Sequence, residues 1–203
     1  MSPSGLRTSS ETIRIGGVSL ALVRPEEPES LLDEDAFADD EFLPYWAELW
    51  PAGLALARAL PDDLEGVRVV ELGCGLGVPS LVAAARGAHV TAVDWATDAI
   101  ALLRENAAHN DLTIDAVRAD WRAFDGSFDL ALAADVLYEA RNVEPLAELL
   151  SRIAPQALVG LAGRSYEREF LERVRQFARV REQGKVARLE LDNARNDGPC
   201  HAP

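Results

Sequence analysis

The chain has 203 residues, of which 48% are hydrophobic, so it can bury one substantial core and is expected to form one domain with small additions. Twenty Lys and Arg residues stand against 34 Asp and Glu residues, giving a formal net charge of -14. The molecule as a whole should therefore repel phosphate backbones, which disfavours a nucleic-acid substrate. A lysine-rich protein or a small amine is an easier partner, although acidity can also serve solubility alone.

The sequence contains no pattern typical of export or of membrane insertion. Cys74 lies in a glycine-rich stretch and Cys200 lies close to the last residue, so no disulfide framework is indicated. Residues 1–10 are polar, and no apolar run approaches the length that spans a membrane. We therefore expect a cytoplasmic protein without a membrane segment; a monomer is compatible with these features.

The first predicted element is a hairpin over residues 12–23, because apolar and polar residues alternate there around Gly16-Gly17, a pair that suits a tight turn. We expect this hairpin to be appended to the main sheet. Prolines and acidic residues over 25–41 then indicate a solvated connector. Residues 1–43 are assigned to the hairpin and this connector.

From residue 44 onward the pattern alternates between strands and helices. The predicted strands cover residues 67–72, 88–94, 113–118, 128–134 and 157–161. The predicted helices cover residues 54–60, 79–86, 97–110 with Thr97 as N-cap, 143–153 and a segment from Tyr166 to Phe177, before a last hairpin of 178–181 and 186–191. This order predicts an α/β fold with a doubly wound sheet and one antiparallel strand near its edge. The main domain is assigned to residues 44–192 and a flexible tail to 193–203.

The glycine-rich loop that follows the strand at 67–72 is the first candidate for ligand binding. In doubly wound sheets a ligand lies beyond the carboxyl ends of the strands, where the strand order reverses. Gly73, Gly75 and Gly77 leave the backbone of this loop without side chains, so a ligand can approach closely. Asp94 ends the next strand, where a carboxylate can accept hydrogen bonds from both ribose hydroxyls of an adenosine. Glycines also make ordinary turns, but the loop and the acid together indicate a nucleoside site.

The spacing within this loop distinguishes between nucleoside cofactors. Dinucleotide-binding folds use G-x-G-x-x-G and present a helix N-terminus to a pyrophosphate. Here the spacing is G-x-G-x-G around Cys74, and Glu71 precedes it. An acid at that place would repel a pyrophosphate but could hold the ammonium group of a methionine moiety, directly or through water. The pattern therefore favours S-adenosylmethionine over NAD.

Aromatic residues supply further candidates for contacts with this cofactor. Asp120-Trp121 follows the third strand, where the carboxylate can accept a hydrogen bond from an adenine amino group while the indole lies against the ring. Trp95 can pack on the adenine, and Trp50 can cover the methionine end, where a sulfonium gains from an aromatic face. Each tryptophan can equally be a core residue.

The fourth strand ends in a second pair of candidates, Asp135 and Tyr138, on the segment Ala133-Ala134-Asp135-Val136-Leu137-Tyr138. This position places a carboxylate and a phenol beside the expected methyl group. Methyl transfer from a sulfonium is an in-line displacement, so the protein has to align a neutral nucleophile and exclude water. We interpret Asp135 as holding an amine and Tyr138 as orienting it, and the group that removes the proton stays open. In the alternative interpretation Asp135 only caps the following helix.

Taken together, these residues resemble the seven-β-strand protein-lysine methyltransferases, a class I, Rossmann-like and S-adenosylmethionine-dependent group that includes the electron-transfer-flavoprotein β-subunit lysine methyltransferase. The resemblance covers roughly residues 44–177 and rests on Pro44-Tyr45-Trp46, Leu49-Trp50-Pro51, the loop from Glu71 to Gly77, Asp94, Trp121 and the stretch from Ala134 to Tyr138. It implies a seven-stranded sheet and cofactor contacts from Trp50, Gly73, Gly75, Asp94, Trp121 and Ala134. It also implies that Asp135 and Tyr138 face an acceptor lysine.

One departure from the resemblance concerns the acceptor. Gly163-Arg164 is similar to a pair that follows the fifth strand in relatives, but Leu161-Ala162 stands where the flavoprotein-modifying relatives carry an acid and a proline. The leading hypothesis is a protein-lysine N-methyltransferase. One alternative is a methyltransferase for a small amine or a pyridine nitrogen, because a fold says little about acceptor size. Others are a cofactor-binding module without activity, a dehydrogenase, which the glycine spacing disfavours, and a nucleic-acid methyltransferase, which the charge disfavours. No metal site is predicted.

Overall fold

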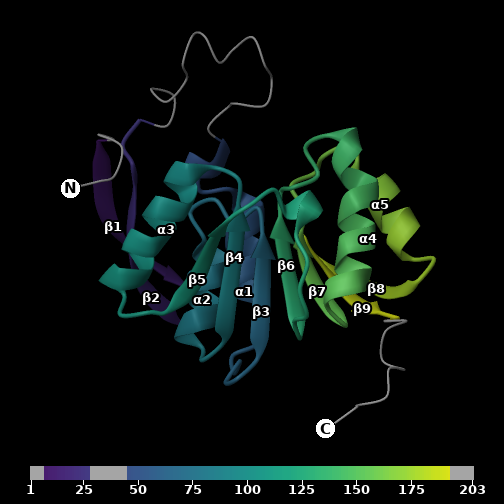
Figure 1. Cartoon of the computed structure of the whole chain (residues 1–203), viewed down its shortest axis with the longest axis horizontal. Coiled ribbons are helices and arrows are strands. Elements are labelled where there is room, and N and C mark those ends of the chain that lie inside the picture. Colours follow the sequence, from purple (N-terminus) through teal and green to yellow (C-terminus); the bar gives the residue numbers. More distant parts are fainter. Residues whose placement is uncertain (1–6, 28–44, 193–203) are drawn as a thin grey trace, which may run out of the picture.

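The computed structural model describes residues 7–27 and 45–192 (Figure 1). Most of the predicted connector and the whole predicted tail fall on residues 28–44 and 193–203, which lie outside the described residues. Within the two described ranges, no helix combines the length and the apolar character needed to cross a membrane.

The main sheet has seven strands, as predicted. They are β3 (Arg68–Leu72), β4 (His89–Asp94), β5 (Ile114–Arg118), β6 (Leu130–Ala134), β7 (Gln156–Gly160), β8 (Ala178–Gln183) and β9 (Val186–Leu191). Their order is β5-β4-β3-β6-β7-β9-β8, and β9 runs antiparallel to both of its neighbours. Because β3 pairs with β4 on one side and with β6 on the other, the strand order reverses beside β3. The sequence pattern had indicated a ligand site at this edge.

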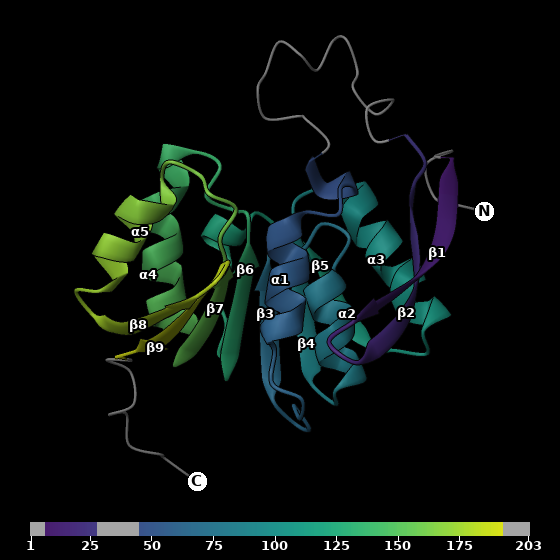
Figure 2. The ribbon, with the colours of Figure 1, turned by 180° about the vertical axis from the view of Figure 1, so that it is seen from behind.

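Helices cover both faces of the sheet (Figures 1 and 2). They are α1 (Pro51–Ala59), α2 (Val78–Ala85), α3 (Thr97–His109), α4 (Val143–Ile153) and α5 (Glu167–Val174), with short 3-10 turns η3 (Tyr45–Ala47), η4 (Trp121–Ala123) and η5 (Ala140–Asn142). Successive side chains of β3 point to opposite faces, so Val69 packs into the core under α1, α2 and α3, while Val70 packs into the core under α4 and α5. The predicted last helix was too long, because α5 ends at Val174 and Phe177 lies beyond it.

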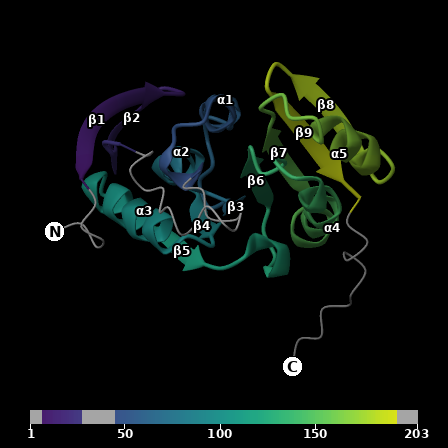
Figure 3. The same cartoon turned by 90° about the horizontal axis from the view of Figure 1, so that it is seen from above.

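The N-terminal hairpin was predicted correctly, but its place in the fold was not. Strands β1 (Thr8–Ile15) and β2 (Val18–Pro25) meet at Gly16 and Gly17, whose φ angles of 56° and 80° suit the predicted turn. The hairpin forms a separate two-stranded sheet and is not appended to the main one. It packs against α3 and α2 instead, as the view from above shows (Figure 3).

Two asparagines, Asn106 of α3 and Asn110 at its C-cap, take the place of a third strand beside β2. Asn106 accepts a hydrogen bond from the Val23 amide at 2.7 Å and donates one to the Val23 carbonyl at 3.0 Å. Asn110, one helical turn later, makes the same pair of bonds with Ala21 at 2.8 Å and 2.7 Å. The i, i+4 spacing on the helix thus matches the i, i+2 spacing of the inward-facing backbone groups of β2. Polar backbone groups that the docking buries are satisfied in this way.

A buried arginine secures the turn of the hairpin. Arg86, at the end of α2, donates hydrogen bonds to the carbonyls of Gly16, Leu60 and Pro61. Its side chain is only 5% exposed. The guanidinium therefore joins the hairpin turn to the residues that follow α1.

We predict that Asn106→Ala lowers the free energy of unfolding by about 2–3 kcal/mol, because it leaves the buried amide and carbonyl of Val23 without partners. Urea denaturation followed by circular dichroism measures this value. Glu105→Ala, on the neighbouring and more exposed position of α3, is the control and should change it by less than about 0.5 kcal/mol. Equal losses in the two variants would contradict the assigned role of Asn106.

Candidate active site

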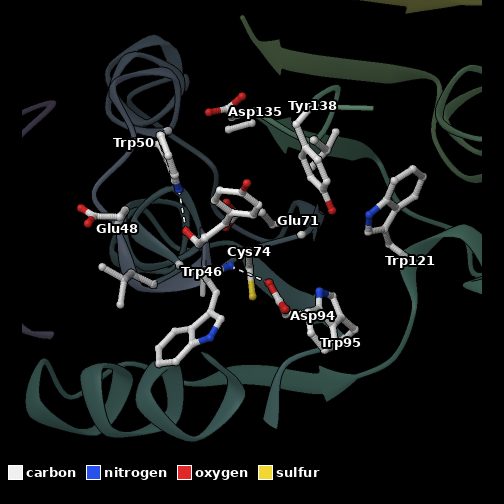
Figure 4. Close-up of a pocket in the computed structure, with 18 of the residues that line it drawn as sticks. Trp46, Glu48, Trp50, Glu71, Cys74, Asp94, Trp95, Trp121, Asp135 and Tyr138 are labelled. Atoms are coloured by element: carbon white, nitrogen blue, oxygen red, sulfur yellow. Dashed lines mark hydrogen bonds between the residues drawn. The ribbon is translucent and has the colours of Figure 1, made fainter. Parts of the chain in front are cut away.

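A cavity of about 1090 Å³ lies at the carboxyl ends of β3, β4 and β6, where the strand order reverses (Figure 4). Small-molecule sites usually occupy roughly 300–1,000 Å³, so this cavity has room for a nucleoside and part of a second reactant. Every site residue predicted from the sequence lines it: Trp50, Glu71, Gly73, Cys74, Gly75, Gly77, Asp94, Trp95, Asp120, Trp121, Ala134, Asp135 and Tyr138. The structure brings these residues together, and their individual roles stay predictions.

The glycine loop between β3 and α2 has a backbone that other residues would strain. Gly73, Gly75 and Gly77 have φ angles of 67°, 51° and 70°. A Cβ atom on Gly73 would lie 2.9 Å from a methyl group of Val136, and one on Gly75 would lie 3.0 Å from the carbonyl oxygen of Trp46. The loop therefore follows a tight path between neighbouring segments along the wall of the cavity.

Asp94 fixes this loop from the end of β4. Its carboxylate accepts hydrogen bonds from the amides of Gly75 and Ala96, each at 2.9 Å (Figure 4 shows the first). Burial raises the pKa of Asp94, although both hydrogen bonds oppose the shift. Ala96, which donates the second of these bonds, is the N-cap residue of α3. The sequence-based prediction of Thr97 as the N-cap was therefore wrong. Asp94 thus joins β4, the loop and α3, and the expected contact with a ribose stays a prediction.

Glu71 lies beneath the loop, and its side chain is almost wholly buried. One of its carboxylate oxygens accepts hydrogen bonds from both the amide and the hydroxyl of Ser80, in the first turn of α2. Burial raises the pKa of Glu71 to about 8, because the bonds from Ser80 compensate only in part for the loss of water. Glu71 therefore binds a proton near neutral pH, and its negative charge is available only at higher pH.

We predict that the free energy of unfolding falls as the pH rises, because Glu71 has to take up this proton when the protein folds. The folded pKa of Glu71 lies above its unfolded value, so the stabilising effect is complete below about pH 4.5 and is lost as the pH approaches 8. The slope should reach up to about 1.4 kcal/mol per pH unit. Urea unfolding between pH 5 and pH 9 measures it, and Glu71→Gln should reduce the slope. Identical slopes in the two proteins would contradict the raised pKa.

The tryptophans and the acid that line the cavity beside β4 and β5 differ in exposure. Trp121 is buried in the core under α4, whereas Trp95 is 41% exposed. Asp120 accepts hydrogen bonds from the amide and the guanidinium of Arg122. Burial tends to raise the pKa of Asp120, but the bonds from Arg122 outweigh it and the net shift is downward. Trp121 is thus a core residue that also forms part of the cavity wall, and its contact with an adenine ring stays a prediction.

At the other end of the cavity, Asp135 follows β6 with a left-handed φ of 55°, which is uncommon for a residue other than glycine. Both of its carboxylate oxygens accept hydrogen bonds from Arg164, at 2.8 Å and 3.0 Å. Tyr138 is 40% exposed, and partial burial of its phenol raises its pKa. Figure 4 shows this phenol turned toward Trp121 and away from the Asp135 carboxylate.

Two further residues of this end were not among the predicted site residues. The ring of Tyr45 lies between those of Trp50 and Tyr138, with centroid distances of 6.2 Å and 5.8 Å. The Arg164 guanidinium carbon lies 5.7 Å from the centre of the Trp50 ring. The density of aromatic residues in the sequence was a usable signal for Tyr45. No sequence signal pairs Arg164 with Asp135, which is 29 positions away.

The cavity wall carries six acidic residues and four arginines, so acids are in excess there as they are in the whole molecule. Three acid–arginine pairs contribute to its wall: Asp120–Arg122, Asp135–Arg164 and Glu139–Arg141. Within the described residues, no group of three or more His, Cys, Asp or Glu side chains could hold a metal ion. The net charge of -14 therefore does not reveal that three of these acids are paired with arginines.

A glycine loop after the first strand, an acid at the end of the second and a large cavity at the switch point define a nucleoside-binding α/β protein. Comparison with known proteins narrows this class. A family model described as a methyltransferase domain matches residues 69–156. A protein N-lysine methyltransferase of Danio rerio is 32% identical over 153 residues, which cover 67% of this chain and 70% of that protein. The chain therefore belongs to the class I, S-adenosylmethionine-dependent methyltransferase family.

The matches to other relatives cover a smaller share of those proteins, and the relatives differ in what their names say they methylate. The electron transfer flavoprotein beta subunit lysine methyltransferase of Xenopus laevis is 32% identical over 136 residues, 60% of this chain and 54% of that protein. A ubiquinone biosynthesis O-methyltransferase of Methylocella silvestris is 37% identical over 94 residues, 45% of this chain and 37% of that protein. The chain thus spans about half or less of the length of these two relatives.

The fold is shared with solved methyltransferase structures. A T. Thermophilus 16S rRNA methyltransferase in complex with AdoMet and guanosine superposes with a TM-score of 0.64 at 18% sequence identity. The match covers 92% of this chain and 51% of that one. At this level of identity the likeness establishes the Rossmann-like fold and leaves the acceptor open.

Proposed function

We propose that this chain transfers a methyl group from S-adenosylmethionine to the side-chain amine of a lysine in a protein. The observation that carries the proposal is the single cavity that joins the glycine loop and Asp94 to Asp135 and Tyr138. Lysine methyltransferases among the relatives, including the one that matches over 70% of its length, support the choice of acceptor. The acidic surface is compatible with a lysine-rich partner.

The residues around the cavity fit this cofactor. We assign the backbone of the glycine loop and Asp94 to the adenosine, since the loop lacks side chains where a ligand approaches and the acid lies beside it. Trp95, Asp120 and Trp121 are assigned to the adenine end. Glu71 is assigned to the methionine end as a neutral hydrogen-bonding group, because its raised pKa leaves it protonated near neutral pH and removes the charge attraction that the sequence suggested. The aromatic face of Trp50 is assigned to the same end.

The remaining wall of the cavity is assigned to the acceptor. S-adenosylmethionine supplies a methyl group on a positively charged sulfur, so the acceptor has to offer a neutral nitrogen lone pair in line with it. Asp135 and Tyr138 border the place where that nitrogen would arrive. The rings of Tyr45 and Trp50 cover the same end and would keep water away from the reacting atoms.

We predict that Asp94→Asn binds S-adenosylhomocysteine about 10- to 100-fold more weakly than the unchanged protein, because an amide replaces a charged acceptor of hydrogen bonds. Isothermal titration calorimetry measures the affinity. The control is Asp129→Asn, which breaks a bidentate acid–arginine pair with Arg68 at the opposite end of the sheet and should leave the affinity unchanged. Failure of the unchanged protein to bind S-adenosylhomocysteine would contradict the assignment of the cofactor.

The acceptor is tested by incubating cell lysate with the protein and S-adenosylmethionine carrying an isotopically labelled methyl group. Mass spectrometry should locate the label on lysine residues of proteins. Label found only among small molecules would replace the proposed acceptor with a small amine or a pyridine nitrogen. The absence of label in both fractions would favour a cofactor-binding module without activity.

In the same assay, Asp135→Asn should lower methyl transfer at least about 100-fold, because the acceptor nitrogen is no longer aligned with the methyl group when the carboxylate is lost. Asparagine tolerates the left-handed backbone of this position, so the fold should persist. Affinity for S-adenosylhomocysteine is measured in parallel and should stay within about twofold. Asp129→Asn again serves as the control for a lost acid–arginine pair. Full transfer by Asp135→Asn would remove Asp135 from the acceptor end.

A further inference from the structure

The acceptor end of the cavity already contains a cation that belongs to the chain itself. An ammonium group is recognised by a carboxylate and by the face of an aromatic ring. Asp135 and Trp50 provide these two elements, and the Arg164 guanidinium occupies both. It bonds to the two oxygens of Asp135 at 2.8 Å and 3.0 Å and lies 5.7 Å from the centre of the Trp50 ring.

The Asp135 carboxylate has little room for a second cation. Its side chain is only 5% exposed, whereas that of Arg164 is 40% exposed. The bidentate pair uses both carboxylate oxygens in the geometry that arginine favours. Of the two charged groups, the guanidinium is therefore the one that is accessible at this end of the cavity.

The loop that carries Arg164 is held in place from the other side. Glu167, in the first turn of α5, accepts hydrogen bonds from the amides of Ala162 at 2.6 Å and Gly163 at 3.1 Å. Glu167 is itself buried. Because Gly163 has a φ of 89°, the chain turns sharply just before Arg164. The backbone of Arg164 is thus fixed, and its side chain is directed by the bonds to Asp135.

We propose that Arg164 determines which protonation state of an amine can reach the acceptor end. The positive charge of Arg164 balances the negative charge of the Asp135 carboxylate. A protonated amine therefore finds no free carboxylate and is repelled by the guanidinium, whereas a neutral amine is not repelled. Lysine side chains are ordinarily protonated below about pH 10, and only the neutral form is a nucleophile. Arg164 is therefore a specificity-determining residue that excludes the unreactive form. This inference rests on the proposed function, in which the acceptor atom is an amine nitrogen.

The test uses a lysine side-chain analogue and needs no catalysis. The protein is saturated with S-adenosylhomocysteine at pH 7 and titrated with n-butylammonium chloride, while NMR follows the indole N–H of Trp50. Arg164→Gln should bind n-butylammonium at least about tenfold more tightly than the unchanged protein, because it frees the Asp135 carboxylate. Arg164→Lys retains a positive charge and should resemble the unchanged protein. The double variant Arg164→Gln with Asp135→Asn should lose the gained affinity.

Two controls separate this effect from general damage. Arg68→Gln breaks the comparable pair with Asp129 at the far end of the sheet and should bind n-butylammonium no better than the unchanged protein. The neutral analogue 1-butanol should bind the unchanged protein and Arg164→Gln with affinities within about twofold. Affinity for S-adenosylhomocysteine confirms that each variant is folded.

The inference is overturned if the unchanged protein binds n-butylammonium as tightly as Arg164→Gln does, or if the tighter binding persists when Asp135 is also replaced. It is likewise overturned if no variant binds n-butylammonium. These outcomes are independent of the lysate assay. A protein that methylates lysine could fail this titration, and a protein that methylates nothing could pass it.

Discussion

The site depends on one carboxylate, that of Asp94. Its hydrogen bonds to the amides of Gly75 and Ala96 join the end of β4 to the glycine loop and to the start of α3. These segments come from different parts of the sequence, and each contributes to the wall of the cavity or supports it. Burying a carboxylate costs free energy, and the hydrogen bonds from the two backbone amides compensate for part of that cost. The shape of the cavity beside the glycine loop follows from this arrangement.

Much of the fold could be predicted because its signals are local. The strands are short apolar runs, the Gly16-Gly17 turn permits a hairpin, and Gly73 to Gly77 stand where a doubly wound sheet places its ligand. The position of the hairpin could not be predicted, because Asn106 and Asn110 are ordinary polar residues until α3 meets β2. Contacts between distant segments have no periodicity that a sequence could reveal.

In the candidate site, too, local signals were predictable and contacts between distant segments were not. All predicted residues line one cavity, because a parallel sheet brings the carboxyl ends of its strands to one edge. The pairing of charges within the site was less predictable than the position of its residues. The net charge indicates a strongly acidic molecule, yet Arg122, Arg141 and Arg164 each pair with an acid in the cavity wall. Electrostatic arguments about the acceptor therefore have to begin from these pairs and not from the composition.

The docked hairpin also limits how far this domain can be shortened. Ile15, Leu20 and Leu22 share one core with Leu103 of α3 and with residues of α1 and α2. Deleting residues 7–27 would expose that apolar surface, together with the amides of two asparagines, and would invite self-association. Since Asp94, which fixes the glycine loop, is also bonded to the N-cap residue of α3, the damage would extend to ligand affinity. A trimmed version for screening or crystallisation should keep both strands of the hairpin.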